Sequence, residues 1–248
     1  MLEIRNLSAK RGKKQVLEGI NFRLPSKTIT AVIGKNGSGK STLCECINRT
    51  VAYSGDILFS GKELGTLAPT ERARHISYLP QVHKAPHITV SELVEMGRTP
   101  HRGVFGHMSE EDRLACDEAL DTIGAKQLSC RFADELSGGE RQKAYLAMML
   151  AQDTPVMMLD EPTANMDIAF EKVFYEMLIG LCENGKTMLV VMHDISRAVE
   201  LASHIVLLDG GRLSFFGKTE ECLACGAIER VFNVRRIEAS GKSFFTAR

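Results

Sequence analysis

The feature that most constrains this chain is a glycine-rich stretch at residues 34–42, which reads G-K-N-G-S-G-K-S-T. An apolar, β-branched run at residues 29–33 precedes it and predicts a strand, and residues 43–47 read as the opening of a helix. The spacing G-x-x-x-x-G-K-S/T is typical of a phosphate-binding loop, because glycines let successive backbone N–H groups point inward and the helix N-terminus adds partial positive charge. An ordinary glycine-rich turn is the alternative, and the flanking strand and helix favour the phosphate-binding loop.

This loop supplies the residue types that a bound polyphosphate needs. Lys40 would reach the β- and γ-phosphates, and the Ser41 hydroxyl would bind a Mg²⁺ ion that bridges them. We therefore expect nucleotide binding by the whole loop, that is by Gly34, Lys35, Asn36, Gly37, Ser38, Gly39, Lys40, Ser41 and Thr42.

Composition narrows the choice of partners and compartment. The chain has 248 residues, of which 44% are hydrophobic and 25% charged, as is ordinary for a soluble globular protein. Lysine plus arginine and aspartate plus glutamate both number 31, so no basic excess points to nucleic acid as a partner. The N-terminus shows no signal-peptide pattern, and the apolar runs fall far short of the roughly 20 residues that span a bilayer.

Cysteine usage indicates a reducing compartment. The seven cysteines are odd in number and irregularly spaced, which fits reduced thiols of the cytosol and not a disulfide framework. Cys222 and Cys225 form one close pair. Because no second pair stands at zinc-finger spacing, we interpret these two as helix thiols one turn apart and not as a metal or redox site.

The chain is expected to form a single domain in two parts. Residues 1 to about 30 alternate apolar and polar around a turn at 11–14, which predicts an antiparallel hairpin region. From about 88 to 150 the apolar periodicity becomes helical, and the α/β pattern then resumes. We therefore expect an α/β core formed by residues 1–87 and 151–248, with a helical subdomain between them.

Finer elements follow from caps and apolar runs. Ser109 begins a capping box for a helix that ends at Gly124, and Asp167 can cap a second helix. A strand is expected over residues 73–79, and residues 205–208 read as the last strand of the core.

Polar residues follow four apolar strands at the point where each strand ends. They are the phosphate-binding loop, Gln81, the adjacent pair Asp160 and Glu161, and His193. In a parallel α/β sheet, ligands bind just beyond the carboxyl ends of the strands. The polar residues should therefore converge on one side of the sheet.

These convergent residues suit the hydrolysis of a nucleotide. Asp160, with Ser41 and Gln81, suits the Mg²⁺ shell, and Glu161 suits a general base that orients the attacking water. His193 is expected to contact the γ-phosphate, and Gln81 to contact the water or the metal. The structural alternatives are a solvated strand end for the acids, a satisfied core or surface histidine, and a turn residue for the glutamine.

A second anion-binding helix end is predicted at residues 136–142, which read L-S-G-G-E-R-Q. Ser137 and Glu140 form a capping box, so the plain interpretation is a well-started helix. Gly138 and Gly139 also expose backbone N–H groups to an anion. Together with Ser137, they would give the chain a second contact for one nucleotide.

This ordered set resembles the ATP-binding subunits of ABC transporters along nearly the whole chain. The correspondence covers the Walker A loop at 34–42, the Q-loop glutamine Gln81, the signature at 136–140, the Walker B segment at 156–160 with Glu161, the D-loop at 164–167 and the switch histidine His193. The resemblance implies an α/β fold with a P-loop NTPase (RecA-like) core, an N-terminal antiparallel β subdomain and a helical subdomain that carries the signature. It implies ATP and Mg²⁺ as ligands. It also implies ATPase activity and an ATP-sandwich dimer, in which the signature of one copy closes on ATP held by the second copy.

Two segments narrow the resemblance. Residues 90–101 and 71–81 look like those of importers of iron–siderophore complexes, haem and cobalamin. In such importers this surface receives the coupling helix of an integral membrane permease, with a substrate-binding protein involved only indirectly. The resemblance thus implies a peripheral protein at the cytoplasmic face of the cell membrane. The histidines nearby are interpreted as scattered loop and surface residues and not as an iron site: His83, His87, His101 and His107.

Two positions depart from the family pattern. The family usually has an aromatic residue in the N-terminal hairpin that stacks on adenine, and that position falls near Arg11. A guanidinium can also lie on a ring face, so we expect Arg11 to bind the nucleotide, with weaker base binding. The D-loop often ends in Leu-Asp, where this chain has Met166 and Asp167; methionine conserves the volume.

The sequence therefore predicts the ATPase subunit of an importer, with an iron chelate as the expected cargo. A soluble non-transport ABC ATPase, such as an iron–sulfur assembly factor, is the first alternative, and it would lack the coupling segment around 88–103. A nucleotide-binding regulator without turnover is the second, and Glu161 and His193 argue against it. A DNA-repair or chromosome-structuring ATPase would need long coiled-coil arms, which the sequence does not contain.

Overall fold

The centre of the fold is a largely parallel sheet whose inner strands are buried on both faces. The computed structural model describes residues 1–81, 84–102, 106–163, 166–239 and 241–247. Within them, the sheet has the order β10-β9-β3-β8-β7-β6, and only β10 runs antiparallel to its neighbour. Its strands are β3 (Ile29–Gly34), β6 (Ile76–Leu79), β7 (Val156–Asp160), β8 (Thr187–Val191), β9 (His204–Asp209) and β10 (Arg212–Lys218). Continuous apolar runs such as that of β8 are typical of strands covered on both faces.

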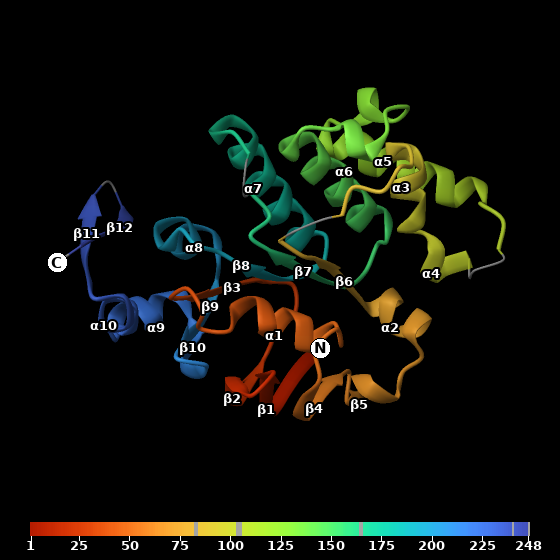
Figure 1. Cartoon of the computed structure of the whole chain (residues 1–248). Helices are drawn as coiled ribbons and strands as arrows, with labels where there is room; N and C mark the ends of the chain where they lie inside the picture. The colour runs from red at the N-terminus through yellow and green to blue at the C-terminus, as the bar shows by residue number, and fades with distance from the viewer. Residues whose placement is uncertain (82–83, 103–105, 164–165, 240, 248) are drawn as a thin grey trace.

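A smaller antiparallel sheet covers one face of the molecule, as the alternation near the N-terminus predicts. Its order is β2-β1-β4-β5, and it is built from β1 (Leu2–Arg11), β2 (Lys14–Arg23), β4 (Tyr53–Phe59) and β5 (Lys62–Glu63). Its inward side chains, such as Leu2 and Ile4, share one core with the helix α1 (Lys40–Ile47) and with β3 and β9. Helix α1 therefore lies sandwiched between the two sheets (Figure 1).

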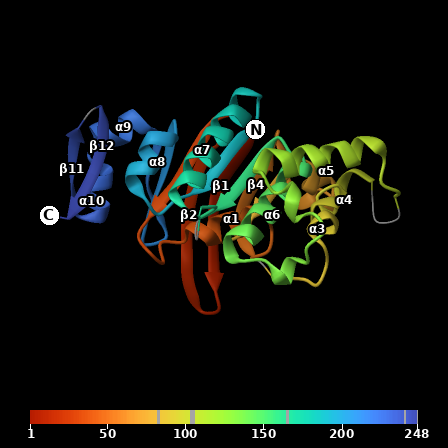
Figure 2. The same ribbon diagram turned by 90° about the horizontal axis from the view of Figure 1, so that it is seen from above.

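Helices cover the opposite face of the central sheet. They are α3 (Val90–Met96), α4 (Thr99–Arg102), α5 (Glu110–Ile123), α6 (Gly138–Ala151), α7 (Ile168–Glu183) and α8 (Ile195–Leu201). All of them except α4 share one apolar core with the sheet. The expected caps at Ser109 and Asp167 and the stop at Gly124 are confirmed. Figure 2 shows α3 to α6 grouped at one end of the sheet. The exact division into a core and a helical subdomain stays a prediction.

A buried ion pair fastens this helical group. Arg98, just beyond α3, pairs with Asp112 of α5 at 2.8 Å, and its Nη1 donates to the Ala151 carbonyl at the end of α6 at 2.8 Å. The Arg98 guanidinium lowers the pKa of Asp112 to about 2. One arginine thus ties three helices together.

Two expected strands differ in the structure. The strand predicted over 73–79 begins only at Ile76, because residues Pro69–His75 form helix α2, with Pro69 at its first position, where a proline is tolerated. The core does not end with β9, since β10 adds to it as an antiparallel edge strand. Its half-exposed side chains hide it from a search for apolar runs.

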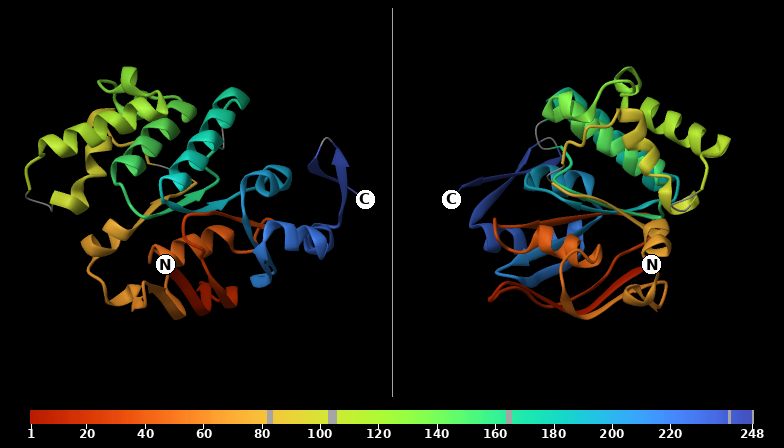
Figure 3. Two further views of the ribbon diagram at one scale, coloured as in Figure 1. Left: turned by 180° about the vertical axis from the view of Figure 1, so that it is seen from behind. Right: turned by 45° about the vertical axis from the view of Figure 1, so that its right-hand side comes forward.

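The C-terminal residues form a separate corner of the fold. They comprise α9 (Thr219–Ala224), α10 (Ala227–Phe232) and the hairpin of β11 (Val234–Ala239) and β12 (Lys242–Ala247). Phe245 packs against the core, and β12 lies beside α8, as the views in Figure 3 show. Cys222 is buried in α9, whereas Cys225 is exposed just beyond it. No helix in the described ranges combines the length and apolarity needed to cross a bilayer.

Candidate functional site

The loop between β3 and α1 depends on glycines at points of close approach. A Cβ atom on Gly34 would lie 2.4 Å from the Leu208 carbonyl oxygen and 2.5 Å from Ser38 Oγ. Gly39 has a φ of 101°, in the left-handed region, and a Cβ there would lie 2.5 Å from Leu17. Larger residues would push the loop away from the strands and close the cradle that the sequence predicts.

Lys40 is folded back over this loop. Its Nζ donates to the Gly34 carbonyl at 2.9 Å and to the Lys35 carbonyl at 3.4 Å. Burial lowers the pKa of Lys40, and the nearby Asp160 and Glu161 partly offset that effect. The lysine therefore carries its charge at the mouth of the loop with no carboxylate bonded to it among the described residues, as a phosphate-binding cation would.

Asp160 at the end of β7 is buried beside the loop. Only 1% of the residue is exposed, and burial raises the pKa of its carboxyl. The hydroxyls of Ser41 and Tyr78 donate hydrogen bonds to this carboxylate, while its Oδ1 has no hydrogen-bond partner among the described residues. An orphaned carboxylate oxygen beside a serine hydroxyl gives two hard oxygen donors.

This donor set fits Mg²⁺. The ion is commonly held by one or two carboxylates together with substrate phosphates, and seldom by a protein cage. Within the described part of the chain there is also no cluster of three or more histidine, cysteine, aspartate or glutamate side chains suited to a metal. Asp160 and Ser41 are therefore the protein ligands that a metal at this loop would find.

The Glu161 side chain lies between two other predicted residues. Gln81, beyond β6, donates through Nε2 to Glu161 Oε2, and His193, beyond β8, contacts Oε1 through Nε2. The Glu161 backbone has a φ of 52°, and its N–H donates to the Val191 carbonyl at 3.1 Å. The strand order β8-β7-β6 thus brings together three side chains that are far apart in the sequence.

These side chains face one cavity of about 520 Å³ with the loop. It is lined by Arg11, Lys14, Val16, Asn36, Gly37, Gly39, Lys40, Ser41, Thr42, Gln81, Glu161 and His193. A volume of this size lies within the usual range for small-ligand sites. The convergence predicted from the four strand ends is therefore present, although the chemical role of each residue stays a prediction.

Arg11 lines this cavity but is already engaged. Its guanidinium pairs with Glu45 of α1, and its Nε donates to Thr42 Oγ1 at 3.4 Å. Lys14 and Val16 of β2 line the same end, and no aromatic side chain is among the described residues that line the cavity. The sequence analysis does not identify Lys14, Val16 or Tyr78. The first two lie at the cavity because β2 packs against the loop, and Tyr78 lies near Asp160 because β6 pairs with β7.

The predicted signature lies outside this cavity. Ser137 Oγ accepts from the Glu140 N–H at 3.4 Å, and Glu140 Oε2 accepts from the Ser137 N–H at 2.9 Å, so the capping box is confirmed. Neither Ser137 nor Gly138 and Gly139 line the cavity. Within one copy, the two predicted anion-binding helix ends do not meet at one site.

The structure describes only some residues of the D-loop and some of the histidines near residues 83–107. Ala164, Asn165 and His83 lie outside the described residues. Met166 packs against the core, and Asp167 accepts from the Phe170 N–H at 2.8 Å. The remaining histidines have separate environments: His87 stacks on Phe132 and pairs with Asp134, His101 bonds the Gln152 carbonyl, and His107 is exposed.

The chain matches known proteins along most of its length. The model of the ABC transporter family matches residues 17–164. The chain is 34% identical to the petrobactin import ATP-binding protein FpuC of Bacillus anthracis, over 99% of this chain and 92% of that protein. It is 38% identical to the ferric enterobactin transport ATP-binding protein FepC of Escherichia coli, over 90% and 84%. It is 34% identical to the iron(3+)-hydroxamate import ATP-binding protein FhuC of Bacillus subtilis, over 90% of this chain and 84% of that protein.

Solved structures agree with this relationship. The inward-facing conformation of a putative metal-chelate type ABC transporter superposes with a TM-score of 0.81 at 26% identity, over 98% of this chain and 95% of that one. The dimeric structure of MJ0796, a bacterial ABC transporter cassette, gives 0.79 at 25% identity, over 88% and 99%. The family model and the relatives together cover nearly the whole chain, which therefore belongs to the ABC transporter family as one of its ATP-binding subunits, an ATPase.

Proposed function

We propose that this chain hydrolyses ATP to energise an ABC importer of iron–siderophore complexes, with haem or a corrinoid as the alternative cargo within the same class. The observation that carries the catalytic part is the Glu161 carboxylate, bound on one oxygen by Gln81 and on the other by His193, at the rim of the phosphate-binding loop. The relatives support the cargo, since their names give petrobactin, ferric enterobactin and iron(3+)-hydroxamate.

In this proposal Glu161 is the base that orients the attacking water. His193 holds one oxygen of that carboxylate and, once ATP is bound, can turn to the γ-phosphate, while Gln81 holds the other. Lys40 leaves the Gly34 and Lys35 carbonyls for the phosphates, which are stronger acceptors because they are charged. Such a positioned base is usually worth about 10² to 10⁴ in rate.

Asp160 and Ser41 would hold Mg²⁺, and Gln81, which lines the same cavity as Ser41, would share in its shell. The metal, when bound, would neutralise part of the charge on the β- and γ-phosphates. Burial raises the pKa of Asp160. A cation beside the carboxylate would act in the opposite direction and favour the ionised form.

A second copy would complete the site. Ser137, Gly138 and Gly139 lie outside the cavity, and a Cβ on Gly138 would meet no atom within 4 Å, so this helix start is open to a partner. The dimeric cassette among the structural relatives supports this arrangement. We therefore assign the signature of one copy to ATP held on the loop of the other, which makes an ATP-sandwich dimer.

The permease is proposed to dock near α3 and α4, with the subunit at the cytoplasmic face of the cell membrane. Residues 88–102 of this segment are described, and residue 103 is not. Arg74 of α2 donates to the Pro100 carbonyl at 2.7 Å, and α2 runs directly into β6, whose end carries Gln81. A force applied at α4 can therefore pass through this hydrogen bond to α2 and then along the backbone of β6 to the residue that contacts Glu161.

Co-purification of the tagged subunit from detergent-solubilised membranes tests this proposal. We expect a polytopic permease, together with a substrate-binding protein whose ligand names the cargo. Met96→Asp should weaken the permease association while ATP turnover in solution persists, because Met96 is 55% exposed at the end of α3. Leu114→Asp is the matched control, since Leu114 is 56% exposed on α5, outside the segment. Recovery of soluble partners alone would instead favour the non-transport ATPase.

A further inference from the structure

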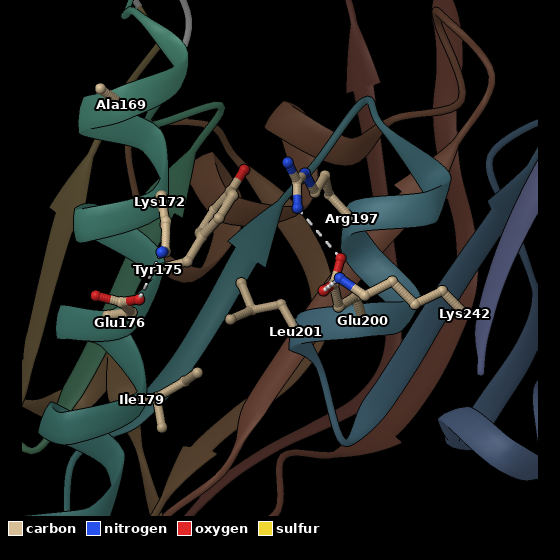
Figure 4. A pocket seen from close by; sticks show the side chains of 9 residues that line it. All are labelled: Ala169, Lys172, Tyr175, Glu176, Ile179, Arg197, Glu200, Leu201 and Lys242. Carbon is tan, nitrogen blue, oxygen red and sulfur yellow. Dashed lines mark hydrogen bonds and ion pairs between the residues drawn. The ribbon is translucent and has the colours of Figure 1, made fainter. Parts of the chain in front are cut away.

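A second large cavity lies between α7 and α8, away from the phosphate-binding loop. Its volume is about 650 Å³, within the range of small-molecule sites. The residues that line it are Ala169, Lys172, Tyr175, Glu176 and Ile179 of α7, Arg197, Glu200 and Leu201 of α8, and Lys242 of β12. Figure 4 shows Tyr175 and Leu201 projecting into the gap from the two helices, with the Lys242 side chain extending toward Glu200 on the α8 side.

The lining has an apolar interior and a charged rim. Tyr175, Ile179 and Leu201 supply the interior, and Ile179 is 44% exposed although it is a large apolar side chain. An exposed apolar surface of this kind marks a binding site more often than an isolated exposed residue does. A ligand with an apolar body would cover it.

The rim carries one more cation than carboxylates. Arg197 and Lys242 both contact Glu200, at 3.2 Å for Arg197. Lys172 lies 3.9 Å from Glu176 on an exposed helix turn, a contact that contributes little. A single negative head group would balance the third cation, whereas a cationic ligand would have to compete with Arg197 and Lys242 for Glu200.

We infer that this cavity binds a small amphipathic anion, one with an aliphatic or aromatic body and a single carboxylate or sulfonate, and that its occupancy reduces ATP turnover. The binding part stands on the cavity alone, and the effect on turnover rests on the function proposed above.

Tyr175 connects this cavity to the catalytic edge. It also lines a smaller cavity of about 180 Å³, next to Glu161 and His193. Its hydroxyl donates to Glu171 Oε1 at 2.7 Å and lies 3.4 Å from Thr163 Oγ1, two residues beyond Glu161. One side chain thus touches both the ligand cavity and the segment that follows the proposed base.

Helix α8 provides a second connection. It begins directly after His193, with Asp194 as its cap, which accepts from the Arg197 N–H at 3.1 Å. A molecule wedged between α7 and α8 would therefore fix the spacing of the two helices that follow Glu161 and His193. Because these two residues must rearrange around ATP in the proposed mechanism, fixing the helices should slow hydrolysis.

Binding is tested on the nucleotide-free protein, with 8-anilino-1-naphthalenesulfonate as a fluorescent probe. Dodecanoate should displace the probe at a concentration at least tenfold lower than dodecyltrimethylammonium, both below their micelle concentrations. Lys242→Glu should remove that preference. Equal displacement by the two ions, or no bound probe, would overturn the assignment.

A filled cavity provides the matched test. Ile179→Trp should weaken probe binding at least tenfold, because the indole occupies the space. Val173→Trp should leave it unchanged, since Val173 is 57% exposed on the same helix but does not line the cavity. Equal loss in both variants would show that the probe binds the apolar surface of α7 and not the cavity. ATP-dependent association weakened by Ile179→Trp alone would assign the face to the second copy and overturn the ligand site.

Phosphate release tests the effect on turnover. Saturating dodecanoate should slow it at least twofold in the native chain. Tyr175→Phe keeps the ring in the cavity and removes the hydroxyl contacts, so it should bind the probe normally and lose the response. Normal probe binding without any slowing in the native chain would refute the coupling, whereas absence of ATP hydrolysis under all conditions would refute the proposed function and leave the binding result standing.

Discussion

Two helices of this chain begin with glycine-rich segments, and they satisfy their N-terminal backbone groups in opposite ways. Helix α1 has Gly39 in a left-handed conformation as its cap, with no side-chain hydrogen bond at that cap. Helix α6 is closed by its own capping box, in which Ser137 and Glu140 bond each other's backbone. The comparison teaches that the first helix start is prepared for a ligand of its own chain, whereas the second is stable without one.

The acids near the two helices differ in the same way. Burial raises the pKa of Asp160 beside α1, whereas the Ser137 N–H lowers the pKa of Glu140 at α6. The buried Asp160 carboxylate therefore lowers the stability of the nucleotide-free protein, whereas the Glu140 carboxylate stabilises the helix that contains it. A strained arrangement of this kind is what a binding site requires, and a satisfied one is what a scaffold requires.

The largest expected effect comes from the α1 site. Glu161→Gln should lower the rate of phosphate release at least a hundredfold, because the amide cannot act as a base. ATP affinity should persist, since Lys40 and the loop are intact. Glu111→Gln, an exposed change on α5, is the control and should leave the rate unchanged. Unaltered hydrolysis in Glu161→Gln would remove this residue from the role of base.

A second variant tests whether α6 serves the partner's site. Gly138→Arg should lower hydrolysis at least tenfold without lowering ATP binding to the isolated chain, and it should fold, because a Cβ there meets no atom within 4 Å. Mixing this variant with Glu161→Gln should restore activity, since one of the two composite sites in a mixed dimer is then intact. If mixing gives no recovery, the signature does not act across a dimer.

Thermal melting of the nucleotide-free chain compares the two acids directly. The raised pKa of Asp160 means that its charge opposes folding at neutral pH, and this cost disappears as the pH falls below the unfolded-state value. Asp160→Asn should therefore raise Tm by about 2–4 °C, the shift that roughly 1 kcal/mol produces in a chain of this size.

Glu140→Gln should lower Tm by a smaller amount. The lowered pKa of Glu140 means that its contribution is present above the unfolded-state value and is lost as the pH falls through the folded-state value. Calorimetry at pH 7 and at pH 4 would check that Tm rises in Asp160→Asn and falls in Glu140→Gln. Shifts in the same direction for the two variants would contradict the distinction between the two helix starts.

The smallest effect is expected at the end of the cavity lined by Arg11, where the adenine of ATP is expected to lie. Arg11 is paired with Glu45 and would have to leave this ion pair to stack on a base. Arg11→Tyr should tighten ATP binding about fivefold, since base–aromatic stacking is worth roughly 1–3 kcal/mol and the loss of the ion pair offsets part of it. Equilibrium binding of a fluorescent ATP analogue measures the change, and Arg5→Tyr on the same strand is the control.

The sequence predicts the parts of this fold that depend on local pattern. Apolar runs that end in polar residues identify β3, β7 and β8, and capping residues identify the starts of α5 and α7. What it does not predict depends on neighbours. Tyr78 reaches Asp160 because β6 pairs with β7, and Arg11 meets Glu45 across the fold from another element. The half-exposed β10 and the C-terminal hairpin also lack a strong apolar signal.

The order of strands in the central sheet has a consequence for how the protein is made. Strand β3, which carries the phosphate-binding loop, pairs on one side with β8 and on the other with β9, both near the other end of the sequence. During synthesis, both edges of the apolar strand β3, which is wholly buried in the folded protein, therefore stay unpaired until most of the chain has left the ribosome. Long-range parallel pairing of this kind folds slowly and exposes open edges to aggregation, so the nascent chain depends on protection until β8 and β9 arrive.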